Sequence, residues 1–342
     1  MKKGILISLM YCILLFGCSK VDYSNDLLIP YKNILGFNGF VNKEGITVIR
    51  AKYKMVDLFY EGIAVVQKKD NKFYFLKKDG TFLNSNSYVF AHNFSHDKLA
   101  LVGIRVNDIP KVGYINVKGE IEIECKYDRA RPFHDGFAAV ATKSGEKYEW
   151  YFIDTKGYKI GNNTYKQVGY FSEGLCAVKN WQDEVLFVNN LGKEELKLFG
   201  ISDVKLFKEG LCVYLIEKKF GFIDRNGKVV IKNIFDEAEN FSEGLAAVGT
   251  LINGVIIYGY INKKGEYSIR PQFIKADEFY HGYAIVCVEN NGKNKFGIIN
   301  KTGQFVVEPV FEEIYRVEEC YVGSNGFGEN VFINEDMTLK KF

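Results

Sequence analysis

Short apolar runs separated by polar turns recur along the chain, and many of these runs are copies of one another. The run FGFID at residues 220–224 has close counterparts in YGYIN at 258–262 and FGIIN at 296–300. Apolar runs of this length, bounded by turn residues, are typical of buried strands. The pattern therefore predicts a β structure made of repeated units. More divergent copies occupy residues 38–42, 73–77, 112–116, 150–154 and 185–189.

A glycine follows each of these strands in the pattern Asn/Asp-x-x-Gly, as in Asp224 and Gly227. The first residue of this pattern can bond the backbone of its own turn, and glycine in the fourth place accepts a left-handed conformation. Successive glycines lie 35 to 39 residues apart, which predicts eight units of about 37 residues. The glycines are Gly45, Gly80, Gly119, Gly157, Gly192, Gly227, Gly265 and Gly303.

The second half of each unit combines spaced aromatic residues with a further glycine turn. Phe235, Ala238 and Phe241 are three residues apart, and similar triplets occur in other units. A spacing of three fits neither a simple strand nor a long helix, so we expect a bent or bulged connection whose rings face the core. A turn and another strand follow. The turn glycines are Gly62, Gly136, Gly174, Gly210, Gly244 and Gly282.

These motifs resemble those of the WG-repeat (KWG-type) family, over about residues 28–342. The family pattern runs W-G-[YF]-I-[DN]-x-x-G, then a strand ending near I-x-P, then F-x-E-G-x-A-x-V. In this chain the Trp survives only at Trp150, and the Pro appears at Pro271 and Pro309, with a partial match at Pro30. The resemblance implies an extracytoplasmic or interaction-type repeat protein and supplies no catalytic residues.

The repeats predict an all-β fold of the β-propeller type, because no single unit can bury its aromatic face alone. Residues 28–37 contain only a connecting segment, and residues 330–342 contain only an opening hairpin. Since these are different parts of one unit, we expect the two ends to complete a shared blade and remove an open sheet edge. An open β-superhelix with two caps is the alternative.

The N-terminus has the features of a bacterial lipoprotein signal. Lys2 and Lys3 precede a short apolar run that ends at Gly17 and Cys18, and the run is too short to span a bilayer comfortably. The last four residues, LFGC, resemble a lipobox, which implies lipid modification at Cys18 and anchoring on a membrane. The alternative is an ordinary secretory signal. We expect a signal peptide at 1–17, a short linker at 18–27 and a single repeat domain at 28–342.

Composition and charge limit the classes of partner that the protein is expected to bind. The 342 residues include 45 Lys and Arg and 42 Asp and Glu, for a net charge of +3. These charges are scattered, which argues against a nucleic-acid footprint. Beyond Cys18 the five remaining cysteines are an odd number without C-x-x-C spacing, so neither a disulfide framework nor a zinc site is expected. Cys176 and Cys212 occupy small core positions of the repeat, and no metal or cofactor is predicted.

The residues that could act in catalysis occupy recurring turn positions of the repeat, which explains their presence without a catalytic role. The chain lacks the usual hydrolase, zincin and nucleotide-binding motifs, and His134 and His281 lie at a variable turn position that indicates solvent exposure. An acidic residue precedes the turn glycine in most units, and we expect it to stabilise that turn rather than form a cation-binding rim. These acids are Glu61, Asp135, Glu173, Glu209 and Glu243.

Trp181 is the best single candidate for a ligand contact, because it lies in a loop between units and has no counterpart elsewhere. Specificity could also reside in the insertions at 84–87, 103–111 and 145–149. The sequence favours a non-catalytic, membrane-anchored scaffold that binds a protein or a cell-envelope polymer. The alternatives are a glycan-active enzyme or carbohydrate-binding protein, and a purely structural spacer.

Overall fold

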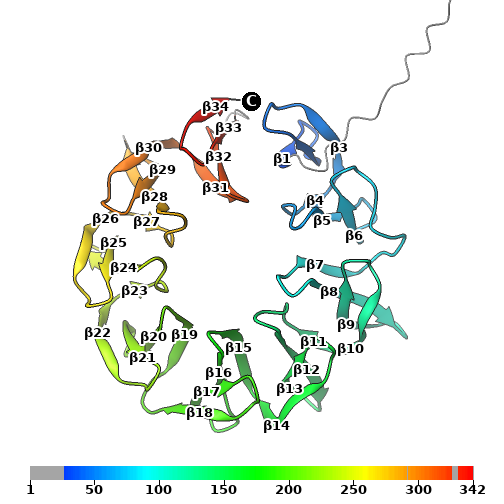
Figure 1. The fold of residues 1–342 in the computed structure, drawn as a ribbon, viewed down its shortest axis with the longest axis horizontal. Coiled ribbons are helices and arrows are strands. Elements are labelled where there is room, and N and C mark those ends of the chain that lie inside the picture. Colours follow the sequence, from blue (N-terminus) through cyan, green and yellow to red (C-terminus); the bar gives the residue numbers. More distant parts are fainter. Residues whose placement is uncertain (1–26, 291, 326–329, 342) are drawn as a thin grey trace, which may run out of the picture.

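The computed structural model describes residues 27–290, 292–325 and 330–341. Within these residues the strands form nine separate antiparallel sheets, arranged as the blades of a ring (Figure 1). We number these blades 1 to 9 in chain order. The all-β propeller prediction is confirmed, and the open superhelix is not needed. In the described part of the chain, no helix has the length and apolar character needed to cross a membrane.

Most blades contain four strands in sequence order, running from the centre to the outside of the ring. Blade 1 contains β1 (Ile29–Lys32), β2 (Asn38–Val41) and β3 (Thr47–Tyr53), and blade 2 contains β4 (Met55–Val56), β5 (Ile63–Gln67) and β6 (Phe73–Lys77). Blade 3 contains β7 (Phe90–Phe94), β8 (Leu99–Val106), β9 (Ile109–Asn116) and β10 (Ile121–Tyr127). Blade 4 contains β11 (Arg129–Ala130), β12 (Phe137–Ser144), β13 (Lys147–Asp154) and β14 (Lys159–Tyr165).

The remaining five blades all have the four-stranded order. Blade 5 contains β15 (Gln167–Ser172), β16 (Leu175–Lys179), β17 (Val185–Asn189) and β18 (Glu194–Leu198); blade 6 contains β19 (Asp203–Lys208), β20 (Leu211–Ile216), β21 (Lys219–Asp224) and β22 (Val229–Phe235). Blade 7 contains β23 (Glu237–Ala238), β24 (Leu245–Ile252), β25 (Val255–Asn262) and β26 (Tyr267–Phe273); blade 8 contains β27 (Lys275–Ala276), β28 (Tyr283–Asn290), β29 (Lys293–Asn300) and β30 (Phe305–Phe311). Blade 9 contains β31 (Glu313–Val317), β32 (Cys320–Ser324), β33 (Asn330–Ile333) and β34 (Leu339–Lys341).

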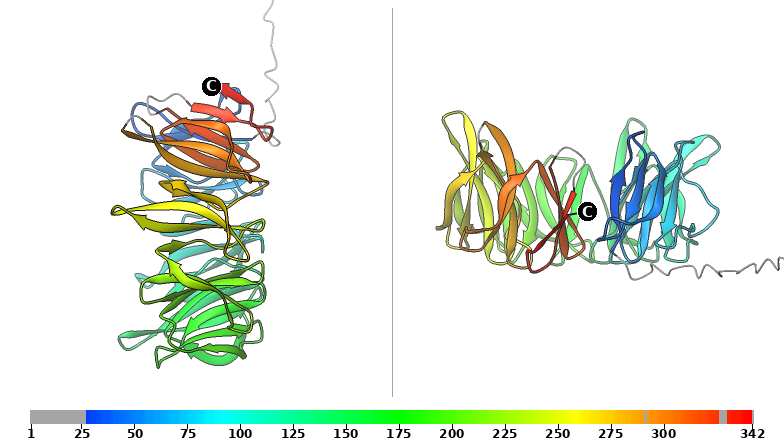
Figure 2. Two further views of the ribbon diagram at one scale, coloured as in Figure 1. Left: turned by 90° about the vertical axis from the view of Figure 1, so that its left-hand side faces the viewer. Right: turned by 90° about the horizontal axis from the view of Figure 1, so that it is seen from above.

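The strand order gives the ring two different faces, seen edge-on in Figure 2. One face, here called the turn face, carries the turn between the first and second strands of a blade and the turn between its third and fourth strands. The other, here called the hairpin face, carries the hairpin between the second and third strands and the link to the next blade. The chain described here begins on the turn face, because β1 runs from there to the hairpin at residues 33–37.

The core lies between neighbouring blades. Phe222 of blade 6 packs against Phe241 of blade 7, with ring centroids 4.9 Å apart, and both side chains are buried. Phe235 and Ala238 belong to the same apolar cluster. The predicted connection with its rings facing the core is therefore confirmed, since it becomes the short inner strand of a blade together with its flanking residues. Each blade buries its aromatic face on the next, as expected for stacked repeats.

The prediction of a shared terminal blade is wrong. Strands β31–β34 pair with one another, and β1 pairs with β2 of its own blade. The reason is that each sheet combines the second half of one sequence unit with the first half of the next. The hairpin near the C-terminus is therefore completed by residues 313–324, and residues 29–32 complete blade 1. Blade 1 consequently lacks a short inner strand.

Ring closure relies on side-chain packing in place of a common sheet. Ile29 and Val41 of blade 1 share a buried cluster with Val317, Val322 and Phe332 of blade 9. We call this contact between the first and last blades the seam. The predicted signal peptide, Cys18 and the linker up to residue 26 lie outside the described residues.

Candidate binding site

The acidic turn residues have a structural role, but it differs from the one expected. Glu173, Glu209 and Glu243 each adopt a positive φ, between 52° and 53°. Each carboxylate accepts a hydrogen bond from the glycine N–H of the following blade's turn. The closest donor–acceptor distances are 3.1 Å for Gly210 to Glu173, 3.1 Å for Gly244 to Glu209 and 2.9 Å for Gly282 to Glu243. The acids therefore connect neighbouring blades and do not stabilise only their own turn.

A basic residue from the following blade completes each of these contacts. Lys301 Nζ lies 2.9 Å from a carboxylate oxygen of Glu243 and also donates to its backbone carbonyl at 3.1 Å. Lys263 contacts Glu209 in the same way, and Arg225 contacts Glu173. The first turn of one blade is thus bound to both turns of the next.

The electrostatics of Glu243 follow from this arrangement. Partial burial disfavours the carboxylate, but Lys301 and the N–H of Gly282 outweigh that cost and hold the pKa of Glu243 below its ordinary value. Since its oxygens are already engaged, this carboxylate is poorly suited to bind an added cation. Within the described residues, no cluster of His, Cys, Asp and Glu has metal-binding geometry.

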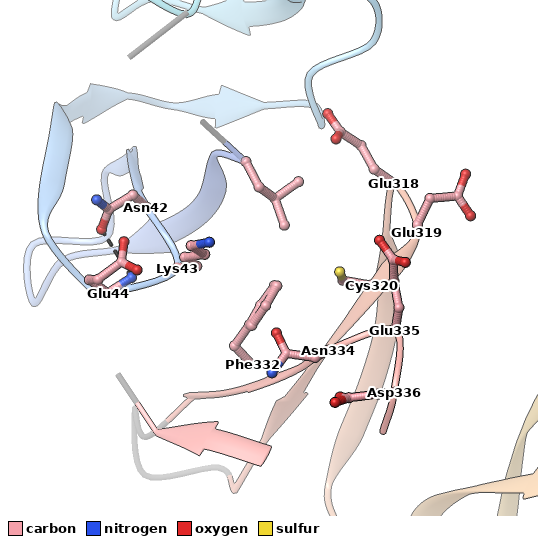
Figure 3. Close-up of a pocket in the computed structure, with 11 residues that line it drawn as sticks. Asn42, Lys43, Glu44, Glu318, Glu319, Cys320, Phe332, Asn334, Glu335 and Asp336 are labelled. Atoms are coloured by element: carbon pink, nitrogen blue, oxygen red, sulfur yellow. Dashed lines mark hydrogen bonds between the residues drawn. The ribbon is translucent and has the colours of Figure 1, made fainter. Parts of the chain in front are cut away.

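A cavity of about 560 Å³ lies at the seam, on the turn face (Figure 3). It occupies the place where blade 1 lacks an inner strand and a first turn. Blade 1 contributes Lys43 and Glu44 to its wall, and blade 9 contributes a group of acids together with the apolar side chain of Phe332. The acids from blade 9 are Glu318, Glu319, Glu335 and Asp336.

Most of the seam acids already have partners in the protein. Glu318 pairs with Lys78 of blade 2 at 3.6 Å, and Glu319 pairs with His281 at 3.0 Å. Glu44 pairs with Lys340 at 3.3 Å. Burial raises the pKa of the nearby Cys320 thiol, so it is a poor nucleophile. These contacts give the seam cavity a role in ring closure.

A second cavity, of about 420 Å³, lies between the hairpins of blades 4 and 5 on the hairpin face. We call it the tryptophan pocket, because it is lined by Trp150 and Trp181, the only two tryptophans of the chain. Trp150 lies on β13, two residues after Tyr148 and on the same side of the strand. The Trp181 indole leans back over blade 4, where its N–H lies 3.4 Å from Thr164 Oγ1. The remaining lining residues are Arg129, Lys147, Tyr148, Lys166 and Gln167.

The tryptophan pocket carries positive charge beside its rings. The Arg129 guanidinium lies 3.8 Å from the centroid of the Tyr148 ring, and Lys147 Nζ lies 5.5 Å from that of Trp181. Lys166 pairs with Asp183 at 2.6 Å. In the described part of the chain, neither Arg129 nor Lys147 has an ion-pair partner. The pocket therefore presents flat apolar surfaces and two cations that form no ion pair within the described residues.

The structure brings only some of the predicted contact residues together. Trp181 and the insertion at 145–149 meet in the tryptophan pocket, and the insertion at 103–111 forms another hairpin on the same face. The insertion at 84–87 instead follows β6 where other blades have an outer strand, and Asn84 Nδ2 donates to the carbonyl of Gly119 at 2.7 Å. Neither Trp150 nor Arg129 was predicted from the sequence as a contact residue, because only the cross-strand register aligns both with Ala141.

Blade 8 holds two carboxyl groups with perturbed acidity directly after its inner strand β27. Burial raises the pKa of both Asp277 and Glu278. Asn240 lies 3.5 Å from Glu278, and Arg316 stacks on the nearby Tyr280 ring at 3.7 Å. Both carboxyls are shifted in the same direction, which differs from an acid and nucleophile pair separated by their environments.

The histidines and cysteines considered in the sequence analysis lie at turns and in the core. His281 is exposed and stacks on Tyr280, and the His134 imidazole is 3.3 Å from Asp135. The predicted small core cysteines, Cys176 and Cys212, are buried, and burial raises the pKa of the Cys176 thiol to about 12. All five described cysteines are free thiols.

The chain is similar to several solved structures, the first of which superposes closely enough to support the fold. The crystal structure titled "the eukaryotic initiation factor" superposes with a TM-score of 0.59 at 11% identity, covering 92% of this chain and 95% of that chain. BamB from Moraxella catarrhalis gives a TM-score of 0.41 at 8% identity, covering 76% of this chain and 93% of that one. Hsv2 from Kluyvelomyces marxianus gives 0.43 at 12% identity, covering 74% and 95%. No curated protein sequence matches the chain.

A family model described as "WG containing repeat" matches five segments distributed along the ring. The matched residues are 39–73, 113–146, 220–249, 258–291 and 296–319. They include the strand, the glycine turns and the inner aromatic residues on which the resemblance was based. The chain is therefore a WG-repeat protein, and its repeats form a nine-bladed β-propeller.

Proposed function

We propose that this protein is a membrane-anchored extracytoplasmic lipoprotein whose propeller is a non-catalytic scaffold that binds a protein or a cell-envelope polymer. The observation that carries the proposal is the difference between the two faces of the ring. On the turn face, repeated acids and glycines bind neighbouring blades to each other. The hairpin face is built from segments that differ from blade to blade, which is where binding residues concentrate on rigid scaffolds.

Apolar side chains at the hairpin tips support a binding role for the hairpin face. Ile34 is fully exposed, and Ile109 and Leu251 are more than half exposed. These tips offer apolar surface that a bound partner would bury. Other exposed apolar residues of these hairpins are Leu35, Val106, Trp181, Ile252 and Val255.

A lipid on Cys18 would orient the ring. The described chain begins on the turn face, and Cys18 lies nine residues before Leu27. Nine residues span about 30 Å at full extension. The anchor would therefore hold the turn face toward the membrane and leave the hairpin face available to partners.

Metabolic labelling tests the anchor. Cells that produce the protein are grown with a clickable palmitate analogue, and the label on the protein is compared with that on a Cys18→Ala variant. We expect label and membrane association in the wild type and neither in the variant. Equal labelling of both proteins would contradict lipidation at Cys18.

Affinity capture from the cell envelope tests the binding role. Alanine substitutions at Ile109 and Leu251 on the hairpin face are compared with a matched substitution at Leu191, an exposed residue on the turn face. We expect the hairpin variants to lose captured material and the Leu191 variant to retain it. Capture that is unaffected by the hairpin variants would contradict the assignment of the binding face.

A further inference from the structure

The tryptophan pocket combines features that point to one class of ligand. The geometry points to a binding site for the acidic sugar units of a polysaccharide, with a uronate carboxylate placed between Arg129 and Lys147. The inference rests on the proposed scaffold function and deepens it, because it selects the envelope polymer over the protein partner at this site.

The aromatic side chains supply the first part of the argument. Trp150, Trp181 and Tyr148 come from the facing hairpins of two blades and line one cavity of about 420 Å³. This volume lies within the usual range for small-molecule sites. Indole and phenol rings bury large, flat apolar areas, and the C–H face of a pyranose ring is flat and apolar in the same way. Trp181 is 37% exposed, so part of its surface remains open to a ligand.

The cations supply the second part. Arg129 and Lys147 line the same cavity as the rings, and neither forms an ion pair with a carboxylate among the described residues. A guanidinium offers planar, paired donors that match a carboxylate. By contrast, the acids of the seam cavity are largely engaged by lysines and a histidine. The tryptophan pocket therefore has unused binding capacity for an anion.

The combination favours an acidic sugar over an acidic peptide or a neutral sugar. A glutamate side chain provides a carboxylate but no flat apolar ring, and a neutral sugar provides the ring but no charge. A uronate unit provides both within one monomer. The pocket opens on the hairpin face, so the neighbouring units of a polymer would continue across the surface of the ring.

Tryptophan fluorescence gives a direct readout, because both tryptophans of the chain line this pocket. The full-length protein in detergent is titrated with a short oligogalacturonate. The matched ligands are the methyl-esterified oligogalacturonate, which lacks the charge, and polyglutamate, which lacks the ring. We expect saturable quenching or a spectral shift with oligogalacturonate, at least tenfold weaker binding of both matched ligands, and weaker binding at high salt.

Variants assign any response to the pocket. Arg129→Gln and Lys147→Gln are each expected to weaken binding about tenfold, the effect typical of one hydrogen bond to a charged group. Trp181→Ala is expected to weaken binding by a similar factor, followed through Trp150 or by calorimetry. Lys218→Gln removes a cation from the hairpin of blade 6 and is expected to bind as the wild type does. Equal melting temperatures verify folding of all four variants.

The outcomes distinguish this inference from the broader function. If the envelope capture succeeds but oligogalacturonate gives no saturable response, the sugar assignment is wrong and the scaffold function stands. Equal binding of polyglutamate, or a response unchanged in Arg129→Gln and Lys147→Gln, also overturns the assignment. If no envelope component is captured and no oligogalacturonate binds, both proposals are wrong.

Discussion

At the scale of single residues, the repeated Glu-Gly turn shows how one local conformation serves the whole ring. In blade 7 the backbone groups of Ser242 and Leu245 exchange two hydrogen bonds around Glu243 and Gly244. Both central residues have positive φ, at 53° and 86°, which is the geometry of a type I′ hairpin turn. The glutamate adopts the less favourable backbone conformation. In return, its carboxylate accepts a hydrogen bond from a glycine N–H of the next blade and forms an ion pair with a lysine.

Substitution at Gly244 tests this turn. A Cβ atom at Gly244 would have no neighbour within 4 Å, so any cost of substitution comes from its φ of +86° and not from a clash. We expect Gly244→Val to destabilise the protein by about 1–3 kcal/mol, since β-branched residues avoid positive φ. Gly244→Asn should cost less, because Asn tolerates the left-handed region. Thermal unfolding measures both, and a Val variant as stable as the wild type would refute the turn geometry.

The pH dependence of stability tests the contact of Glu243 with the next blade. A native pKa below the ordinary value of 4.5 means that this contact stabilises the fold at neutral pH. The contribution is lost as the pH falls through that ordinary value toward the lowered native pKa. We expect Glu243→Gln to be less stable than the wild type by about 1 kcal/mol or less at neutral pH.

The difference in stability between Glu243→Gln and the wild type should shrink in acid, because glutamine does not titrate. Denaturant unfolding at a series of pH values measures it. A difference that stays constant with pH would show that Glu243 acts through packing alone. Lys301→Gln provides the partner control, since it removes the cation and leaves the carboxylate in place.

At the scale of the strands, the glycine of the WG motif is explained by a bulge in the outer strand. In blade 7, Tyr258 and Tyr260 are opposite Phe273 and Ile269, so the outer strand has extra residues facing Gly259. A Cβ atom on Gly259 would lie 2.6 Å from the carbonyl oxygen of Ile269. Blade 5 has Leu186 at this position, and there β17 pairs with β18 in continuous register from Val185 to Phe187, with a register shift only after Phe187. The bulge faces the glycine in blades 1, 3, 6, 7 and 8, whereas in blade 4 a register shift faces Tyr151.

Gly259→Ala tests the close approach of the two strands. The added methyl group must displace the backbone of β26, for which we expect a loss of about 1–3 kcal/mol. Gly169→Ala is the matched control, because its Cβ atom would meet its nearest neighbour at 3.2 Å and needs only a small adjustment. Chemical denaturation compares the two variants. Equal stability of Gly259→Ala and the wild type would mean that the bulge is not held against this glycine.

At the scale of the whole molecule, the ring is closed without a sheet shared by its two ends. Each blade is a separate hydrogen-bonded unit, and blades are held together by apolar clusters, turn contacts and ion pairs. The seam differs from the other contacts between blades because blade 1 lacks the inner strand and its turn. Glu318 of blade 9 accordingly contacts Lys78 of blade 2. The cavity at the seam is the volume that the missing elements leave (Figure 3).

Phe332→Ala tests how the ring is closed. Phe332 is 2% exposed and belongs to the cluster that joins blades 9 and 1. Its truncation should cost about 3 kcal/mol, and hydrogen exchange should rise first in the strands of blades 1 and 9. Phe222→Ala, in blade 6, is the matched control and should raise exchange in blades 6 and 7 instead. Uniform exchange in the Phe332 variant would contradict closure by local packing.

The sequence by itself determined the strands, the two kinds of glycine turn and the burial of the inner aromatic residues. These follow from local requirements, since a positive φ selects Gly244 and alternating burial selects residues such as Phe222. The tertiary structure decided how the units are divided among sheets, because strand pairing joins the end of one unit to the start of the next. It also decided that Glu243 contacts a neighbouring blade and that Trp150 and Trp181 meet, since both depend on residues brought together only when neighbouring blades stack.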